Sequence, residues 1–277
     1  MKPEGRSQKN NMVNAIQFIE FLESASSRCF HVLGDDGNEW VVRSRKVGKN
    51  AKRLFNEYAA GNLATNYGLS RPSVSLVRIL PGVLKHLDEN IFDQSCTIGV
   101  GTQYIANLAK VPRPNVSFTS KEFLDANKQH LLAIFGSDYD FTHFYGHRLF
   151  SNWVLLEDYK YETLHISPGR IPVFLDLDLA FGGSGWDTLP NGHTFSRMPQ
   201  YAAYCEGVTS DMSKFEPLFE KFRSIDQDEF DRLIASIPMG WDIPEGYADK
   251  LSSLLFGNID HFIEEFKYNF ELQKLGI

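Results

Sequence analysis

The stretch from Phe150 to Trp186 reads FSNWVLLEDYKYETLHISPGRIPVFLDLDLAFGGSGW. Within it, a turn at residues 167–169 is followed by the apolar run 171–175, which ends in Asp176 and Asp178. A short β-branched and aromatic run bounded by turn residues predicts a buried strand. Carboxylates at the end of such a strand need partners, because burying an unpaired charge is costly.

Two carboxylates flank the predicted hairpin, Asp158 before the turn and Asp176 after the strand. The hairpin would bring them towards one pocket. Phosphoryl transfer uses such a pair, with one acid orienting the acceptor hydroxyl and the other holding Mg²⁺. The same residues also fit a structural role, in which Asp158 caps a turn while Asp176 and Asp178 line a solvated strand end. This stretch alone leaves both interpretations open.

The composition of the 277 residues, 43% hydrophobic and 23% charged, is typical of a soluble globular protein with one large or two smaller domains. A net charge of −7 disfavours direct nucleic-acid binding. Three widely spaced cysteines without zinc-site spacing indicate a reducing compartment. Because the chain has no apolar leader and no run of ~18 apolar residues, we expect a cytoplasmic protein that makes no membrane contact.

The N-terminal third predicts a small antiparallel sheet and one helix. Residues 1–11 are expected to be disordered, and 15–22 to form a strand or a short helix. An Asp-Gly turn within 34–37 separates two β-rich runs, which predicts a hairpin. Apolar residues at helical spacing predict a helix over 51–67 that ends at Gly68, and a strand follows at 74–80. The six basic residues between Arg43 and Arg53 are expected to form mostly a solvated face.

The rest of the chain predicts mainly helices. Residues 82–120 look irregular and are expected to cross between two lobes. Ser120 is a candidate N-cap for a helix over 122–135. Residues 187–211 are expected to form a polar loop. The further predicted helices are 140–153, 213–222, 228–237 and 246–270, the last with an apolar stripe typical of a core.

The predicted order of strand, small-residue loop, hairpin, helix and strand matches the small lobe of a protein kinase. In that fold a cation on a strand pairs with a helix acid and reaches the nucleotide phosphates, and here the candidates are Arg43 and Glu57. The predicted fold is therefore α+β and bilobal. Residues 12–105 would form a small lobe of antiparallel strands with one helix, including the inter-lobe segment. Residues 106–277 would form a larger, mainly helical lobe.

These patterns together resemble the HipA-like kinase domain family, over nearly the whole chain from about Phe18. The matching segments occur in the family's order, and they are Asp35–Arg43, Phe55–Tyr58 with Leu63-Ala64, Gly68-Leu69 and Pro72, Ile98–Tyr104, Phe150–Leu164, Leu175–Phe181, and Ile237-Pro238 with Trp241. The resemblance implies a kinase that uses ATP and Mg²⁺. Asp158 would then be the catalytic aspartate that positions the acceptor, and Asp176 the metal-binding aspartate. Asp178 is a candidate second carboxylate for the metal, with a turn residue as the alternative.

The resemblance also implies residues for nucleotide binding. The family's phosphate-binding loop falls on residues 24–28, so Ser26, Ser27 and Arg28 are candidate phosphate ligands, with an ordinary turn as the alternative. Related kinases can autophosphorylate a serine in this loop, which makes Ser24, Ser26 and Ser27 candidate regulatory sites. Arg43 falls on the phosphate-binding lysine, and Glu57 on its helix partner.

Four positions depart from the family pattern. Arg43 replaces the lysine, and this is not a conservative change because a guanidinium is longer and forked. Thr163 replaces the metal-binding asparagine, so its hydroxyl is a candidate but weaker metal ligand. Ser151 replaces an acid at the start of the catalytic loop, and Tyr159 replaces the arginine after Asp158.

Three functions remain open at this point. The first is an ATP-dependent kinase that phosphorylates a Ser/Thr hydroxyl of a protein or of itself, with a protein substrate or regulatory partner. The second is a pseudokinase that serves as a nucleotide-binding or protein-interaction module. The third is an unrelated thiol enzyme, whose candidate residues are Cys96 or Cys205 with His143, His147 or His193.

Overall fold

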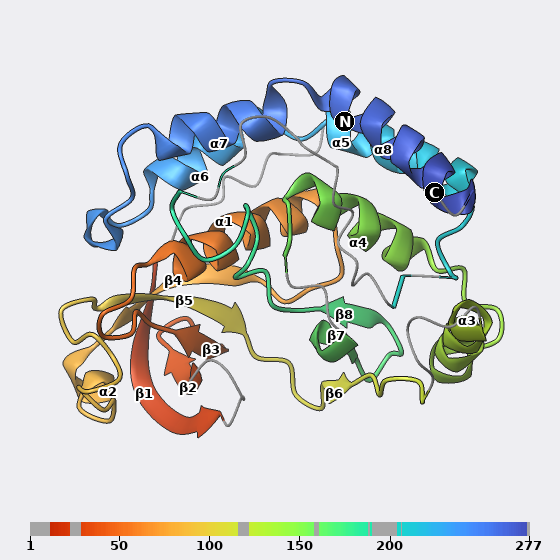
Figure 1. The fold of residues 1–277 in the computed structure, drawn as a ribbon. Coiled ribbons are helices and arrows are strands. Elements are labelled where there is room, and N and C mark those ends of the chain that lie inside the picture. The colour runs from red at the N-terminus through yellow and green to blue at the C-terminus, as the bar shows by residue number, and fades with distance from the viewer. Residues whose placement is uncertain are drawn as a thin grey trace, which may run out of the picture.

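The computed structural model describes residues 12–22, 29–115, 122–157, 161–187, 189, 204–205 and 207–275. The fold is mixed α+β (Figure 1). The N-terminal strands form a barrel, and most of the helices follow it in the chain. The barrel is closed in the order β1-β2-β3-β5-β4. Its strands are β1 (Val13–Leu22), β2 (Cys29–Gly34), β3 (Glu39–Arg43), β4 (Val74–Ile79) and β5 (Ile98–Gln103). The pairs are antiparallel except β1 with β4, which is parallel.

Three short strands form a second sheet in the order β6-β7-β8. They are β6 (Ala109–Lys110), β7 (Leu164–Ile166) and β8 (Pro172–Phe174). The predicted hairpin in the opening stretch is confirmed, because β7 and β8 pair antiparallel with Leu164 opposite Phe174. The helices are α1 (Lys52–Tyr67), α2 (Pro81–Leu84), α3 (Glu122–Phe135), α4 (Thr142–Trp153), α5 (Glu216–Arg223), α6 (Gln227–Ala235), α7 (Tyr247–Phe256) and α8 (Ile259–Leu275), with 3₁₀ turns η1 (Tyr161–Thr163), η2 (Met212–Lys214) and η3 (Met239–Trp241).

The antiparallel pairing of β2 with β3 confirms the predicted hairpin, and residues 15–22 form part of strand β1 rather than a helix. The prediction that residues 82–120 are irregular is wrong, because this segment contains β5. Glycines at 99 and 101 conceal that strand in the sequence. A Cβ on Gly99 would lie 2.3 Å from the carbonyl oxygen of Arg43. The glycine therefore allows β5 to lie close against β3, where a side chain would not fit.

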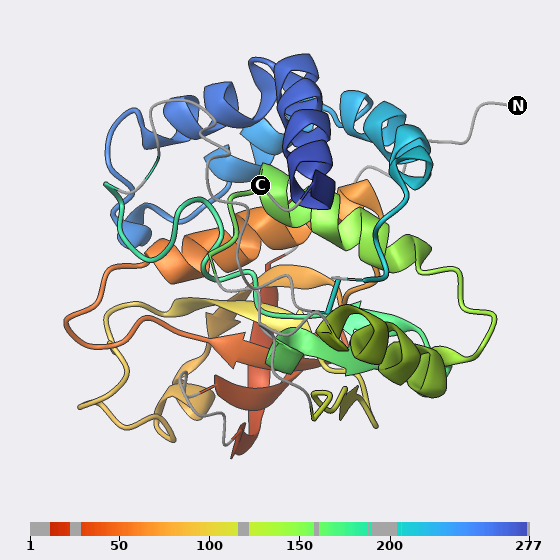
Figure 2. The same ribbon diagram turned by 45° about the vertical axis from the view of Figure 1, so that its right-hand side comes forward.

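Helix α1 is the central element of the molecule, because it lies between the barrel and the helices α5–α8 in both ribbon views (Figures 1 and 2). Twelve of its 16 residues are buried, so both sides of the helix pack against protein. The predicted end at Gly68 is confirmed. This residue has φ +80°, and its N–H bonds back to the carbonyl of Thr65. A glycine at this position closes the helix without the steric cost that a Cβ would bring.

The C-terminal helices differ from the prediction in one place. The expected single helix over 246–270 is two helices, α7 and α8, separated at Gly257 and Asn258. The side chain of Asn258 accepts a hydrogen bond from the N–H of His261, 3.0 Å away, and so caps the start of α8. The continuous apolar stripe concealed this break. Within the described ranges no helix is long and apolar enough to cross a membrane. The predictions for residues 1–11, Ser120 and most of 187–211 lie outside those ranges.

Candidate functional site

Asp176 and Asp178 lie together in a turn rather than on an extended strand. Strand β8 ends at Phe174, and Asp176 has φ +68°, in the left-handed region. Aspartate tolerates this conformation better than most residues. Asp176 and Asp178 therefore do not lie on an extended strand, and the alternative for Asp178, a turn residue, agrees with the structure. They lie together because the chain turns at Asp176 and a further turn begins at Asp178.

Arg43, at the end of β3, binds both of these aspartates. Its Nη2 lies 2.8 Å from Oδ1 of Asp176, and its Nη1 contacts Oδ2 of Asp178. Arg53, in the first turn of α1, also reaches Oδ2 of Asp178, at 2.6 Å. The side chain of Asp178 is 3% exposed, so the two guanidinium groups stand in for the water that it has lost. Residues more than 100 positions apart in the sequence thus form one ionic cluster.

Glu57 lies beside this cluster but does not pair with Arg43, which corrects the predicted pair. Its Oε1 accepts from Nη2 of Arg71 at 2.8 Å, and both side chains are almost fully buried. Its Oε2 accepts from the backbone N–H of Leu177 at 2.9 Å. Glu57 therefore holds the turn between Asp176 and Asp178 by its backbone. Arg71 takes the place at Glu57 that the resemblance assigned to the cation on β3.

The charges of the cluster shift its ionisation. Burial alone would lower the pKa of Arg43, yet the neighbouring Asp176 and Asp178 raise it well above its usual value. Burial would raise the pKa of Asp176, but the Arg43 guanidinium holds it below its usual range. Burial raises the pKa of Asp178 to about 7, although Arg43 opposes the shift. Asp176 is thus the carboxylate that stays ionised opposite Arg43.

Asn56 is a contributor that the sequence reasoning missed. Its side-chain amide donates to the carbonyl oxygens of Asp178 and Gly183, each at 2.9 Å. It therefore fixes both ends of the turn that follows Asp176. A signal for it existed, because Asn56 precedes Glu57 in the segment that resembles the family, and Arg53 lies three residues earlier on the same side of the helix.

The prediction that the basic segment 43–53 is mostly solvated is wrong for several of its members. The Arg43 and Arg45 side chains are only 19% and 15% exposed and Lys52 is fully buried, whereas Arg53 keeps 40% of its side chain exposed. The Lys52 ammonium contacts the Tyr247 hydroxyl and lies 4.5 Å from the centre of that ring. The rings of Phe55, Phe181 and Trp186 also surround it. Burial lowers the pKa of Lys52 to about 7, against the opposing charge of Glu157.

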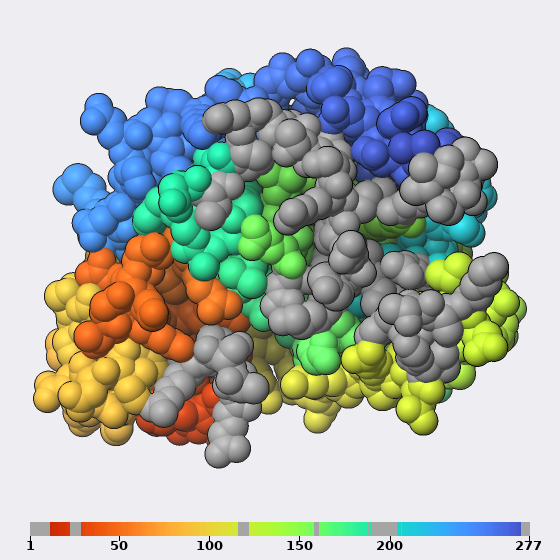
Figure 3. All heavy atoms as spheres, in the orientation of Figure 1, coloured from red at the N-terminus to blue at the C-terminus, as the bar shows by residue number. Residues whose placement is uncertain are grey.

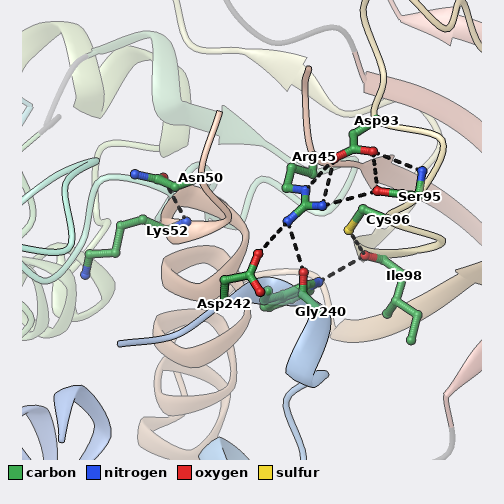
Figure 4. A network of polar contacts seen from close by, with 10 residues as sticks. Arg45, Asn50, Lys52, Asp93, Ser95, Cys96, Ile98, Gly240 and Asp242 are labelled. Atoms are coloured by element: carbon green, nitrogen blue, oxygen red, sulfur yellow. Dashed lines mark hydrogen bonds and ion pairs between the residues drawn. The ribbon is translucent and has the colours of Figure 1, made fainter. Parts of the chain in front are cut away.

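A second polar network ties the loop after β3 to the segment after α6 (Figure 4). Arg45 donates through Nε to Asp93 at 2.9 Å, and through Nη1 to the carbonyl of Gly240 at 3.0 Å and to Asp242 at 3.1 Å. The indole of Trp241 donates to the carbonyl of Ile98 at 3.1 Å. We call this set of contacts the Arg45 clasp.

The space-filling view shows a further contact: the orange atoms near residue 50 lie directly against the teal atoms near residue 180 (Figure 3).

The remaining predicted residues are only partly placed. Thr163 ends η1, and its carbonyl accepts from the N–H of Leu175 at 3.0 Å, so its backbone adjoins the residue before Asp176. Ser151 is buried, with Oγ 3.3 Å from Nδ1 of His147. The predictions for Asp158, for Tyr159, and for the loop residues Ser24, Ser26, Ser27 and Arg28 lie outside the described residues. The predicted role of Thr163 as a metal ligand stays a prediction.

The arrangement as it stands does not fit a divalent metal at Asp176 and Asp178. Mg²⁺ binds carboxylate oxygens directly in a near-octahedral shell. Here guanidinium groups bind Oδ1 of Asp176 and Oδ2 of Asp178. Among the described residues, no group of three or more His, Cys, Asp or Glu side chains is placed to hold a metal ion. A cation bound at Oδ1 of Asp176 would have to displace Arg43.

The thiol-enzyme interpretation gains no support from the described residues. Cys96 and Cys205 are buried, and burial raises the pKa of the Cys96 thiol, whereas a reactive cysteine needs a lowered one. His147 is also buried, which lowers its pKa to about 3. His193 lies outside the described residues.

Comparisons with known proteins relate this chain to kinases. The sequence model of the HipA-like kinase family matches residues 15–138. This confirms the predicted resemblance to HipA-like kinases over that segment, which includes Arg43, Arg53 and Glu57. No curated protein sequence matches the chain.

Among solved structures, the proinflammatory kinase CtkA of Helicobacter pylori superposes with a TM-score of 0.51 at 10% identity, over 91% of this chain and 94% of that chain. At this identity the likeness concerns the fold alone. The open conformation of CtTel1 superposes with a TM-score of 0.43 at 10% identity, over 89% of this chain and 11% of that one. The mixed α+β prediction is confirmed, and the fold is similar to that of the kinase CtkA.

Proposed function

We propose that this chain is an ATP-dependent phosphotransferase of the HipA-like type, which phosphorylates a Ser/Thr hydroxyl of a protein or of itself. The observation that carries the proposal is that Arg43 and Glu57, from β3 and α1, meet Asp176 and Asp178 at one place. Kinases need a phosphate-binding cation, a helix acid and a carboxylate after a strand in such proximity. The structural alternative, an ionic cluster that only stabilises the fold, does not account for the match to HipA-like kinases.

In this proposal the molecule has two lobes, residues 12–105 and 106–277, with the site between them. ATP would bind against Arg43 and the predicted loop of Ser26, Ser27 and Arg28. A guanidinium suits this task because its fork matches phosphate oxygens in a bidentate contact. Asp158 would orient the acceptor hydroxyl, and Mg²⁺ is the cofactor that the resemblance implies. The acceptor would belong to a protein substrate or to this chain.

One observation favours the second candidate, a pseudokinase that binds nucleotide without turnover. Both Asp176 and Asp178 are held by guanidinium groups, as described above. If Arg43 never leaves them, the site cannot assemble for phosphoryl transfer. The chain would then serve as a nucleotide-binding or protein-interaction module.

The two candidates are separated by incubation with labelled ATP and Mg²⁺ or Mn²⁺. The kinase proposal expects phosphoprotein or ADP, and it expects a loss of roughly 10²-fold or more in Asp158→Ala, the size of a typical general-base contribution. Asp176→Asn is also expected to abolish turnover. Asp231→Asn is the matched control, since Asp231 is exposed on α6. ATP binding without phosphoprotein or ADP would contradict the kinase proposal and leave the pseudokinase.

A further inference from the structure

Arg43 spans two carboxylates that a kinase of this fold would offer to a metal. One nitrogen of its guanidinium binds Asp176 and another binds Asp178. The Arg43 side chain is 19% exposed and that of Asp176 33%, so the contact lies at the edge of the protein interior rather than deep within it. Arg53 binds Asp178 as well. Asp178 is thus bound by two guanidinium groups, those of Arg43 and Arg53, whereas Asp176 is bound by that of Arg43.

The backbone of Arg43 has little freedom to move. Arg43 pairs with Val100 across β3 and β5, and Gly99 lies close enough that even a Cβ there would meet the Arg43 carbonyl at 2.3 Å. The turn that carries the aspartates is fixed in the same way, by Glu57 and Asn56. Any change of partner must therefore be a rotation of the Arg43 side chain. A lysine at this position would present a point charge and could not span both carboxylates with a fork.

We propose that Arg43 is a latch that keeps divalent cations off Asp176 and Asp178 until the phosphates of a nucleotide take its guanidinium. A guanidinium carries a full charge at all working pH values and repels a divalent cation from the oxygens that it binds. Phosphate oxygens compete for the same fork through bidentate contacts. Nucleotide then binds before the metal. The nucleotide step rests on the proposed function, whereas the exclusion of cations from the free protein does not.

The exclusion is tested without nucleotide, by titrating the protein with Mn²⁺ and following the electron paramagnetic resonance signal of the free ion. The wild type is expected to bind Mn²⁺ weakly. Arg43→Gln is expected to bind it roughly tenfold more tightly or better, because a repelling charge is gone. The gained site is expected to disappear in the double variant Arg43→Gln/Asp176→Asn. Arg78→Gln removes an exposed arginine from β4 and is expected to match the wild type.

Two results would overturn the latch: equal Mn²⁺ affinity in the wild type and Arg43→Gln, or no binding in either. Circular dichroism checks the fold of each variant. Arg43→Lys is the second variant, because it keeps a positive charge beside the aspartates but lacks the fork. It is expected to bind Mn²⁺ more tightly than the wild type and less tightly than Arg43→Gln, and affinity equal to the wild type would also count against the latch.

The nucleotide step is tested with ATP in the presence of EDTA, by isothermal titration calorimetry. The wild type is expected to bind ATP without metal, and Arg43→Gln is expected to bind it several-fold more weakly. Equal ATP affinity in the two proteins would overturn the exchange of Arg43 between aspartate and phosphate. If neither protein binds ATP with or without Mg²⁺, the proposed function fails, while the Mn²⁺ comparison still decides whether Arg43 excludes cations.

Discussion

The carboxylate of Glu57 accepts a hydrogen bond from the backbone N–H of Leu177, 2.9 Å away. This contact joins the central helix α1 to the residue between the two aspartates of the site. The other oxygen of Glu57 binds Arg71. A chain of contacts thus runs from Arg71 through Glu57 to the turn at Asp176, and the position of the aspartates depends on groups that do not touch them.

Replacing Glu57 by glutamine is expected to destabilise the protein by about 3–5 kcal/mol, the usual cost of leaving one member of a buried ion pair alone. The Arg71 side chain is only 1% exposed, so water cannot take the place of the lost carboxylate. Urea unfolding at pH 7 measures the change. Glu220→Gln, which breaks an exposed pair with Arg223, is the control and is expected to cost about 1 kcal/mol or less.

The double variant Glu57→Gln/Arg71→Met tests whether the pair is the cause. Once both charges are removed, no buried charge is left alone, so the double variant is expected to be more stable than the sum of the two single changes by about 0.5–3 kcal/mol. Strict additivity of Glu57→Gln and Arg71→Met would show that the two side chains do not act as a pair.

Asn56→Leu is expected to cost about 2 kcal/mol or more, because two buried carbonyl oxygens, of Asp178 and Gly183, lose their donor. Urea unfolding at pH 7 measures this loss of stability. Asn62→Leu on the same helix is the matched control. Asn62 donates to the carbonyl of Tyr58, one turn back in α1, so its loss is expected to be less than about 1 kcal/mol. Similar losses at the two positions would contradict a special role for Asn56.

The buried side chain of Lys52 is expected to make the stability of the protein depend on pH. Its pKa is lowered by burial to about 7, whereas a lysine in the unfolded chain has a pKa of about 10.4. Between these values the unfolded chain holds a proton that the native protein has released. The free energy of unfolding should therefore rise with pH across this window, and below about pH 7 the contribution becomes constant.

The comparison is between the wild type and Lys52→Met, by urea unfolding at pH 7 and pH 9. The wild type is expected to gain about 2 kcal/mol relative to Lys52→Met between these pH values. Lys85→Met serves as control, because Lys85 is exposed and its change should leave the pH dependence of the wild type intact. A constant difference between the wild type and Lys52→Met would mean that Lys52 keeps its proton in the native protein.

Local patterns in the sequence predicted much of the fold. The Asp-Gly turn predicted the β2–β3 hairpin, helical spacing and Gly68 predicted α1 and its end, and turn residues before an apolar run predicted β7–β8. Strand β5 was missed because Gly99 and Gly101 lack the side chains that mark a strand. Its place is set by close approach to β3, a tertiary contact without a local signal.

Three residues of the ionic cluster and its neighbour Glu57 could be selected from the sequence, but the pairs that they form, and the parts played by Arg53, Asn56 and Arg71, could not. Arg43, Glu57, Asp176 and Asp178 were each selected by position in a pattern. Which cation binds which acid depends on the fold, because Arg71 lies near Glu57 only once α1 packs beside the start of β4. The burial of Lys52 could not be predicted either, since its aromatic surroundings come from residues 181, 186 and 247, far along the chain.

The Arg45 clasp gives the last prediction. Arg45 joins Asp93 to Gly240 and Asp242, and its side chain is 15% exposed. Arg45→Gln removes these contacts and is expected to free the segment after α6 from the barrel. The N–H of Asp242, which bonds to the carbonyl of Met239, should then exchange its hydrogen faster.

Hydrogen–deuterium exchange over residues 236–245 measures this effect, and the free energy of local opening of this segment is expected to fall by about 1–2 kcal/mol, the size of a partly buried charged contact. Arg78→Gln, an exposed change on β4, is the control and should leave exchange unchanged. Faster exchange confined to residues 236–245 and to the loop around Asp93 would show that the Arg45 clasp stabilises only the contact between these two segments. Uniformly faster exchange across α1 and α7 would instead mean that Arg45 stabilises the whole molecule, and unchanged exchange would mean that contacts other than those of Arg45 hold this segment in place.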